Sequence, residues 1–539
     1  MTRWKTQTFV TAALCAVLCA LSLASAHAAD QRIQFTEQMV GAGHPTSADT
    51  LNRLTRVEHN TDGTHKYLPE LDVRKYGAAC DGTTNDTAAF QAAHDALPNT
   101  STKSGGVIRA VGICIVKNLL LTTPGTRLSG YGGGYVAGKL GATVLQAPNG
   151  VGASDAVVKI NSGYGHNIWI EHLTIYPVAP NTTDKAGRGI LSYGTRPILD
   201  DVVVFAATVL NVDFTGTDSA DGGGIFRSAF YSGGSSGTIR LSGQAINVES
   251  SYINCNGSAT AISVRGIAPT SASAVHTRGL LIETCATPVV DVGDASTGGV
   301  ASYTDDGSRI TNVSGSGNII QLGDTTNGGN FSLIGTEING GSGVQARAIS
   351  VASVSGNVTI APAKITGTYT GGTGAAILAP LGLYGEWDVR SVAGVEYNGY
   401  KGTALLWHYI GTHASAYPLG QGRMSGVTLT TSGATPTAIF APATLQNDML
   451  TTIRASVSAK RPDASAVTGG FFYERQAAFL RTAAGTSSQV GSTAAVVTIE
   501  TDAAANCDIA LATNDAQVQA TGVAATNYNW VGDFEWTVR

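Results

Sequence analysis

Short runs of alternating apolar and polar residues recur through the middle of the chain, from about residue 105 to residue 400. Each run is followed by a polar turn, a second alternating run, and then Gly, Ser, Asn or Asp. The runs are NIWIEHLTIYPV, RPILDDVVVFAA, GGIFRSAFYSG, AINVESSYINC, RGLLIETCATPVVDVG, SRITNVSGSGNIIQLG and NVTIAPAKITG. They lie about 22–34 residues apart, the length of one solenoid coil, and one coil cannot bury its apolar side alone. The pattern predicts stacked coils, a parallel β-helix, rather than a hairpin-rich sandwich with Asn-Gly or Asp-Gly turns.

A helical segment precedes the coils. Residues 72–76 alternate like a short strand, and the spacing of apolar residues then predicts a helix over 86–97. Asn85 or Asp86 can accept hydrogen bonds from the free N–H groups that open the helix, and Pro98 ends it. The helix has one apolar face to lay over a neighbouring surface, formed by Ala89, Phe90, Ala93 and Leu97.

The coil repeat is confined to residues 71–404. Beyond it, segments such as AVTGGFFYERQAAFLRTA, AAVVTIETDA and NYNWVGDFEWTV are typical of antiparallel strands, so residues 405–539 are predicted to form a separate β-sandwich-like module. Aromatic side chains concentrate in this module, and we expect most of them to pack in its core rather than to form a sugar-stacking surface. They are Phe471, Phe472, Tyr473, Trp530, Phe534 and Trp536.

The beginning of the chain has the order of a secretory signal peptide. Two basic residues are followed by an apolar stretch over 9–23 and by small residues ending at Ala28. The stretch is short for a membrane anchor, so we predict cleavage after Ala28. The mature protein is then exported (secreted, periplasmic or at the cell surface) with no membrane partner. Residues 29–70 are polar and irregular, and we interpret them as an extended leader.

Composition narrows the class of protein. The formal net charge is −5, and removal of residues 1–28 makes it more negative because they carry two basic side chains. This balance argues against nucleic acid as a partner. The abundance of Gly, Ala, Ser, Thr and Val, with few Lys and Glu, favours an all-β protein. The sequence contains no zinc-site spacing of Cys and His, and we predict no metal and no cofactor.

Five cysteines follow the predicted cleavage site, an odd number in an exported protein, where disulfides are permitted. Cys80 lies before the predicted helix and Cys114 in the first coil after it, so a disulfide between them would tie the two together. Cys255 and Cys285 either form a bridge between neighbouring coils or remain as buried thiols. The coil alignment below does not place them level, which favours thiols. Cys507 is left without a partner.

Aligning the coils on their apolar runs predicts a column of outward residues. Neighbouring coils of a β-helix lie about 4.8 Å apart, so outward residues at equivalent positions stack along the surface. In this alignment the next coil contributes Thr311. Before it, the outward position is filled in order by Glu171, Asp200, Arg227, Glu249 and Glu283.

Such a column could cleave a polysaccharide. Glu171 with Asp200, and Glu249 with Glu283, would each form a carboxylate pair about one coil apart, close to the ~5–5.5 Å of a retaining glycosidase. Arg227 could bind a uronate or sulfate group, or stabilise an enolate-like intermediate of a lyase. The alternative is a solvated ladder of charges in which Arg227 neutralises its neighbours. An alignment error of one residue would turn the outward residues inward.

The run DVRKYGAACDGTTNDTAAFQAA, followed by SGGVIRAVGICIV, resembles the N-terminal signature of the pectate-lyase-like β-helix superfamily. This superfamily includes rhamnogalacturonase-like and epimerase-like enzymes and many phage tailspikes. The resemblance implies a right-handed parallel β-helix whose open N-terminal end is capped by the helix over 86–97.

Two further stretches resemble phage tail proteins. They are QMVGAGHPTSADTLNRLTRVEHNTDGTHK in the leader and, near the C-terminus, AAFLRTAAGTSSQVGSTAAVV together with VQATGVAATNYNWVGDFEWT. The resemblance implies a tailspike-like architecture, and such spikes are usually homotrimers. The predicted signal peptide departs from this pattern because virion proteins assemble in the cytoplasm, so a bacterial or prophage gene stands beside a phage particle as the origin.

The resemblance implies a depolymerase, a glycoside hydrolase or polysaccharide lyase acting on a bacterial or plant acidic polysaccharide. The alternative is a non-catalytic glycan-binding spike or adhesin of phage origin that recognises a receptor. The residue series of the polygalacturonase family is not present as a set, since Asp200-Asp201 matches only one part of it. Classical pectin hydrolysis is therefore disfavoured.

Overall fold

The structure is a computed structural model that describes residues 70–539 with short gaps. The gaps are at 101–103, 137–138, 161–166, 181–182, 195, 216–221, 258, 267–272, 294–300, 324–327, 353–355, 380–384, 413–417, 443–446, 463–469, 500–503, 513–514 and 524–525. The predicted signal peptide and all but the last residue of the predicted leader lie outside the described residues. Within the described part of the chain, no helix is long and apolar enough to cross a membrane.

The N-terminal segment begins with strand β1 (Glu70–Asp72) and a 3₁₀ helix, η1 (Val73–Tyr76). The strand predicted over 72–76 is therefore wrong for most of its length. The Asp72 carboxylate accepts a hydrogen bond from the backbone N–H of Arg74 at 2.9 Å, which favours a helical turn there. Gly77, with φ of 97°, ends the turn in a conformation that suits glycine.

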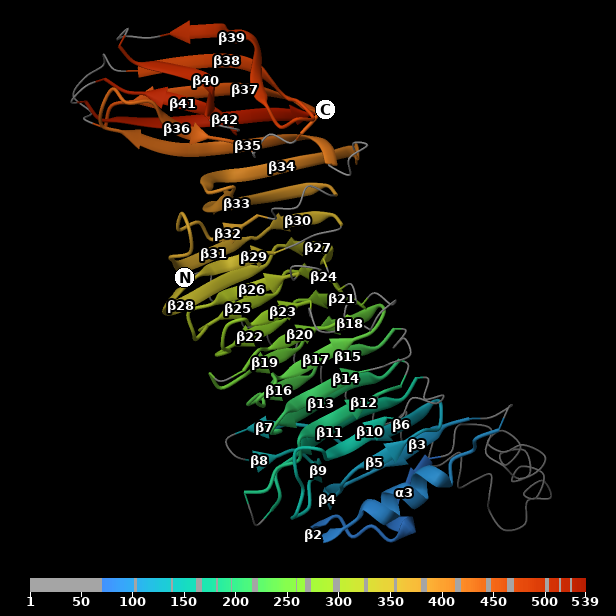
Figure 1. The fold of residues 1–539 in the computed structure, drawn as a ribbon. Coiled ribbons are helices and arrows are strands. Elements are labelled where there is room, and N and C mark those ends of the chain that lie inside the picture. The colour runs from blue at the N-terminus through green and yellow to red at the C-terminus, as the bar shows by residue number, and fades with distance from the viewer. Residues whose placement is uncertain are drawn as a thin grey trace, which may run out of the picture. The chain divides into compact units, whose positions relative to one another are not determined.

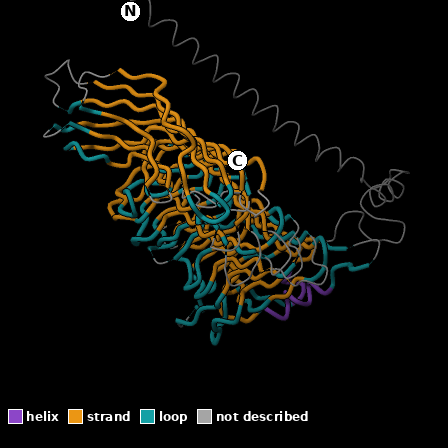
Figure 2. Tube along the Cα trace, turned by 45° about the horizontal axis from the view of Figure 1, so that its top comes forward, coloured by secondary structure: helices purple, strands orange, loops and turns teal. Residues whose placement is uncertain are grey.

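Strand β2 (Asp81–Asn85) and helix α3 (Thr87–Asp95) follow. The helix is shorter than the predicted 86–97 and buries Ala89, Phe90 and Ala93 of the predicted apolar face, while Leu97 is buried just beyond its end. Asn85 accepts a hydrogen bond from the N–H of Thr87, whereas the buried Asp86 accepts hydrogen bonds from Ala79, Cys80 and Ile115. Asp86 therefore fastens the segment before the helix to the first coil, and α3 lies at the end of the strand stack (Figure 2).

The central part of the chain is the predicted right-handed parallel β-solenoid, whose strands lie one above another in Figure 1. Each coil contributes strands to three parallel sheets. The first sheet contains β1, β3 (Gly106–Arg109), β6 (Thr126–Ser129), the first halves of β11 (Trp169–Tyr176) and β13 (Ile198–Phe205), β15 (Gly224–Phe226), β18 (Ile246–Glu249), β21 (Ser273–Arg278), β24 (Ala301–Asp306), β27 (Gly328–Ile334), β30 (Val358–Ala361) and the beginning of β33 (Trp387–Tyr397).

The second sheet contains β2, β4 (Gly112–Ile115), β9 (Thr143–Gln146), the second halves of β11 and β13, β16 (Ala229–Tyr231), β19 (Tyr252–Asn254), β22 (Leu281–Glu283), β25 (Arg309–Thr311), β28 (Glu337–Gln345) and β31 (Lys364–Tyr369). The third contains β5 (Leu119–Leu121), β10 (Ala156–Ile160), β12 (Arg188–Ser192), β14 (Leu210–Thr215), β17 (Ile239–Ser242), β20 (Ile262–Val264), β23 (Val290–Val292), β26 (Asn318–Leu322), β29 (Arg347–Val351) and β32 (Ile377–Leu378). Strands β7 (Tyr135–Val136) and β8 (Lys139–Leu140) form a separate antiparallel pair outside the three parallel sheets.

The turn from the first sheet to the second uses one residue in the left-handed conformation. In successive coils this residue is His172, Asp201, Arg227 and Ser250, with φ between 48° and 54°. The residue after it points into the solenoid, where the buried Ser251 hydroxyl accepts a hydrogen bond from the backbone N–H of Ser228 in the preceding coil. A left-handed residue reverses the inward and outward order of side chains at this turn, which matters for the site below.

Two disulfides cross-link the described chain. Cys80 is bonded to Cys114, the bridge expected between the helical segment and the first coil. Cys255 is bonded to Cys285, which corrects the expectation of buried thiols. Both follow the ends of paired strands, β19 and β22, so their Cα atoms come within 4.7 Å. Cys507 is free and buried.

The pairing changes from parallel to antiparallel at β33, which pairs in parallel with β30 and β32 and antiparallel with β34 (Tyr400–Thr412). The antiparallel sheet continues through β35 (Pro418–Thr431), β42 (Tyr528–Val538), β37 (Met449–Lys460), β38 (Gly470–Arg481) and β39 (Ser487–Ile499). A second antiparallel sheet has the order β36 (Thr437–Phe440), β41 (Asp515–Thr521) and β40 (Asn506–Ala512).

The two C-terminal sheets share an aromatic core. Phe440, from the smaller sheet, stacks on Phe534 with ring centroids 4.7 Å apart. The prediction that most aromatic residues of this module are core is confirmed for five of the six named above, and Phe472 is the exposed one, at 37 %.

Candidate active site

Two carboxylates lie side by side on the outer surface of the first sheet. Strands β11 and β13 pair in parallel, and Glu171 stands in register with Asp200. Because neighbouring strands are about 4.8 Å apart, the two side chains leave the sheet one coil apart. Both are largely shielded from solvent, with 11 % and 14 % of the side chain exposed. The structure thus brings this predicted pair together.

An arginine flanks the pair on each side. Arg127, from the preceding coil, has its guanidinium 4.7 Å from the centre of the Trp169 ring, and its Nη2 lies 3.7 Å from Glu171 Oε2. On the other side, Nη2 of Arg227 donates a hydrogen bond to Asp200 Oδ2 at 2.5 Å. The order along the solenoid is therefore cation, carboxylate, carboxylate, cation.

The residue in register with Asp200 on the following coil is Phe226, not Arg227. Arg227 takes the left-handed turn position instead, with φ of 48°, so the predicted outward column was wrong by one residue at this coil. Gly224 explains why Phe226 can face outward. A Cβ at residue 224 would lie only 2.3 Å from the Phe226 ring, so the ring lies across the glycine, next to Asp200.

The turn residues of the same two coils form a second polar pair. His172 follows Glu171 and Asp201 follows Asp200, and His172 Nδ1 lies 3.0 Å from Asp201 Oδ2. About half of each side chain is exposed, at 46 % for both. The imidazole therefore lies at the edge of the carboxylate pair and within reach of solvent.

Glu249 and Glu283 do not form the second pair that the sequence alignment predicted. Glu249 is on the first sheet, two coils beyond Asp200, and stands in register with Arg278. Glu283 is on the second sheet, in register with Thr311 as expected. The alignment failed because it joined outward positions that belong to different sheets of the solenoid.

Glu283 instead ends a row of aromatic side chains on the second sheet. Its Oε2 accepts a hydrogen bond from the Tyr252 hydroxyl at 2.9 Å. Tyr231 stacks on Phe205 with centroids 4.9 Å apart and planes only 8° apart. Since these two rings stack face to face, they stabilise the contact between neighbouring coils.

One oxygen of the candidate pair has no hydrogen-bond partner among the described residues. Asp200 Oδ2 is held by Arg227, but the buried Oδ1 has no donor. A buried carboxylate oxygen without a donor is costly, and a donor on a bound ligand would satisfy it. This feature sets Asp200 apart from the fully paired Asp213 on the third sheet, which accepts hydrogen bonds from Arg188 and Arg240.

A group with the donor types of a metal site occurs elsewhere in the described chain, at Cys80, Asp86 and Cys114. The two sulfur atoms are joined to each other, and Asp86 accepts backbone hydrogen bonds. These residues do not fit a metal ion, because their ligand atoms are already used.

Sequence reasoning found Glu171 and Asp200 but missed Arg127, Trp169 and Phe226 as their neighbours. Arg127 and Trp169 are in register with each other, two positions before Ser129 and Glu171. The alternation of β-strands puts residues two apart on the same face, so extending the alignment by two positions would have found them.

No protein-family model and no curated protein matches the chain. Three solved structures show a weak likeness in fold. They are the tailspike gp49 of Acinetobacter baumannii bacteriophage Fri1, described as a capsular polysaccharide depolymerase (9 % identity, 86 % of each chain covered, TM-score 0.37), ORF18 of Geobacillus virus E2 (14 %, 80 % of this chain and 77 % of that chain, 0.38) and the tailspike of Acinetobacter phage vB_ApiP_P1 (15 %, 87 % and 86 %, 0.36). The fold assignment rests on the strand pairing of the chain itself.

Proposed function

We propose that the chain is an exported, tailspike-like β-helix enzyme that degrades an acidic polysaccharide, with Glu171 and Asp200 as its catalytic pair. One observation supports this assignment above others. The two shielded carboxylates stand in register on adjacent coils, with an arginine on each side. A separation of about one strand spacing is close to the ~5–5.5 Å that retaining glycosidases use.

In this mechanism Asp200 is the nucleophile and Glu171 the general acid. Asp200 attacks the anomeric carbon while Glu171 gives its proton to the departing glycosidic oxygen, so the glycosidic bond breaks as a glycosyl ester forms. Water, deprotonated by Glu171, then attacks the same carbon and releases Asp200. Asp200 takes the first role because the hydrogen bond from Arg227 fixes its orientation. Glu171 has a looser contact, with Arg127 at 3.7 Å.

The two arginines favour a substrate that carries carboxylates or sulfates. The side chains of Arg127 and Arg227 are 41 % and 66 % exposed, so each retains N–H donors that face solvent. Guanidinium groups bind planar carboxylates in a bidentate manner. A uronate-containing polymer lying along the first sheet would meet both.

The same residues could perform an elimination instead. One carboxylate would remove the proton at C5 of a uronate, and an arginine would stabilise the enolate. The C4–O bond would then break as the C4–C5 double bond forms, and the other carboxyl group would give its proton to the departing oxygen. Hydrolysis and elimination give different products, since only elimination leaves an unsaturated uronate that absorbs ultraviolet light.

The second candidate is a glycan-binding spike or adhesin that does not cleave. The contacts that favour it are those of Arg127 with Glu171 and of Arg227 with Asp200, because a carboxylate already paired with arginine can be a charge ladder that only binds. Glu249, Glu283 and the remaining outward side chains would then contribute to recognition.

Three further parts of the proposal rest on the sequence alone. They are export through the segment 1–28, the kinship of the N-terminal signature with rhamnogalacturonase-like and epimerase-like proteins, and assembly as a homotrimer. Light scattering on the protein lacking residues 1–28 gives the number of chains. N-terminal sequencing after expression with the full sequence shows whether cleavage follows Ala28.

The experiment that tests the activity uses purified protein and a panel of capsular, exopolysaccharide and pectic polymers. Reducing ends report hydrolysis, and ultraviolet absorbance reports elimination. Product from at least one uronate-containing polymer supports the enzyme. Retention on a polymer without any product supports the binding spike and refutes the catalytic pair.

A further inference from the structure

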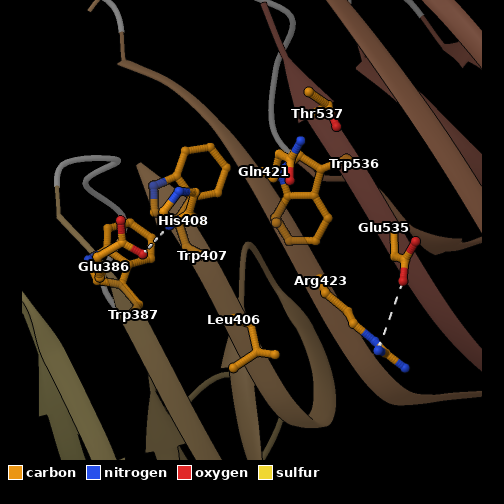
Figure 3. A pocket seen from close by; sticks show the side chains of 11 residues that line it. Glu386, Trp387, Leu406, Trp407, His408, Gln421, Arg423, Glu535, Trp536 and Thr537 are labelled. Atoms are coloured by element: carbon orange, nitrogen blue, oxygen red, sulfur yellow. Dashed lines mark hydrogen bonds and ion pairs between the residues drawn. The ribbon is translucent and has the colours of Figure 1, made fainter. Parts of the chain in front are cut away.

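A polar trough lies on the outer face of the C-terminal antiparallel sheet, where strands β34, β35 and β42 run side by side (Figure 3). Its volume is about 540 Å³. Small-molecule sites of proteins occupy about 300–1,000 Å³. The polar side chains that line it are Glu386, His408, Gln421, Arg423, Glu535 and Thr537.

The sheet beneath the trough is rigid because its inner face holds a row of buried indoles. Trp387 is in register with Trp407, and the centroids of Trp407 and Trp536 are 6.3 Å apart. All three are only 2–3 % exposed. Gly422 lies between the last two and leaves room for the Trp536 ring, since a Cβ there would come within 2.1 Å of it. A trough on this support is formed before any ligand arrives.

Two pairs of charged or polar side chains form the sides of the trough, one in close contact and one not. His408 Nδ1 lies 2.6 Å from Glu386 Oε2, and both side chains are about half-exposed or more. Arg423 and Glu535 stand in register across β35 and β42, yet their closest atoms are 3.9 Å apart. Figure 3 shows the two pairs at opposite sides of the trough, with a dashed line joining the members of each pair. The gap between Arg423 and Glu535 is too long for a direct hydrogen bond, so a ligand hydroxyl group could accept from Arg423 and donate to Glu535.

The chemistry of the lining suits a ligand that is rich in hydroxyl groups and uncharged. Donors and acceptors both line the trough, Leu406 is the apolar side chain on its exposed face, and the buried Trp387, Trp407 and Trp536 also line it. Two carboxylates stand against one guanidinium and one imidazole, so there is no excess of positive charge to attract an anion. Vicinal hydroxyls of a sugar ring present a donor and an acceptor together and match this arrangement.

We propose that the trough between β34, β35 and β42 is a second saccharide site that binds a neutral oligosaccharide. It differs from the carboxylate pair on the first sheet, which is flanked by arginines and suits an acidic polymer. The trough does not depend on the proposed catalytic activity. A protein with both sites would hold a neutral glycan through its C-terminal module while the solenoid acts on an acidic one.

The test is a glycan array holding neutral and uronate-containing glycans, followed by calorimetry of the full chain lacking residues 1–28 with the best neutral oligosaccharide. Gln421→Ala removes an amide from the middle of the trough, and Arg423→Ala removes the guanidinium. Thr428→Ala is the matched control, since Thr428 is exposed on the same strand but outside the trough. Thermal unfolding shows whether each variant is folded.

We expect at least a tenfold increase in Kd for Gln421→Ala and for Arg423→Ala, with no change for Thr428→Ala. Glu171→Gln should leave this binding unchanged even if it abolishes cleavage, which separates the two proposals. The inference is overturned if the array retains no neutral glycan, if only uronate-containing glycans bind, or if folded trough variants bind as tightly as the original protein.

Discussion

Arg227 reaches back by one coil, from a turn between two sheets, and holds Oδ2 of Asp200 at 2.5 Å. With 66 % of the Arg227 side chain exposed, this pair adds little to the stability of the fold, about 0–1 kcal/mol. Its effect should be on the orientation of Asp200. Arg227→Asn, which suits the left-handed turn, should lower kcat/KM at least tenfold on a cleaved polymer and leave the melting temperature nearly unchanged.

The chain offers a matched control for that variant. Arg278 lies on the same face, is 65 % exposed, and pairs with Asp306 at 3.5 Å. Arg278→Asn should keep full activity. Equal loss of activity in both variants would mean that activity depends on the total positive charge of this face. The contact of Arg227 with Asp200 would then have no special role.

The catalytic pair itself is tested by isosteric substitutions. Glu171→Gln and Asp200→Asn keep the shape of each side chain but remove the acid or the nucleophile, so each should lower kcat by about 10²–10⁴-fold. Glu249→Gln and Glu283→Gln should retain activity, since these residues stand apart from the pair. Reducing-end and ultraviolet assays on one polymer measure all four. Full activity of either Glu171→Gln or Asp200→Asn would rule out this assignment.

The sequence was sufficient for the fold, because a repeat of coil length and an amphipathic segment each have one structural explanation. It was insufficient for the register of single residues. Alternation alone places Arg227 outward and Phe226 inward, since the rule expects apolar residues inside. The structure places Phe226 outward, because Gly224 leaves room for its ring, and Arg227 stays exposed at the left-handed turn position that follows.

The same limit explains the fate of Glu283. Outward positions of the first and second sheets have identical patterns, and a turn of two residues separates the sheets in these coils. No local signal in the sequence assigns a coil's carboxylate to one sheet or the other. Only the pairing of whole strands, which also brings Cys255 to Cys285, settles the matter.

The contact between Gly224 and the Phe226 ring gives a prediction about substrate affinity. Gly224→Ala would put a methyl group where the ring now lies, displacing an aromatic surface next to Asp200. We expect KM to rise about tenfold with kcat less affected, because a ring next to Asp200 would contact the substrate in our proposal without taking part in the chemistry. Phe226→Ala should act similarly. An unchanged KM in both variants would show that the ring does not contact the substrate.

The bridge between Cys255 and Cys285 should stabilise the solenoid. It closes a loop with a sequence separation of 30, and removing such a disulfide typically lowers the free energy of unfolding by about 2–5 kcal/mol. Cys255→Ser with Cys285→Ser should therefore lower the midpoint of chemical unfolding. The single variant Cys507→Ser is a control that removes a buried sulfur without a bridge. A double variant as stable as the control would contradict the bridge.

Cys507 should give the folded protein a distinctive response to alkaline pH. Burial raises the pKa of its thiol from 9.0 to about 12. Between pH 9 and pH 12 the folded state therefore keeps a proton that the unfolded chain loses. The free energy of unfolding falls over this range by about 1.4 kcal/mol per pH unit, so this contribution to stability is fully present below pH 9 and is lost as the pH rises toward 12. In the protein lacking residues 1–28, a thiol reagent at pH 8 should find no reactive group until denaturant is added, and one per chain afterwards. Cys507→Ala should remove both the late reaction and this part of the pH dependence. Rapid labelling of the native protein at pH 8 would show that the thiol is accessible and the pKa shift absent.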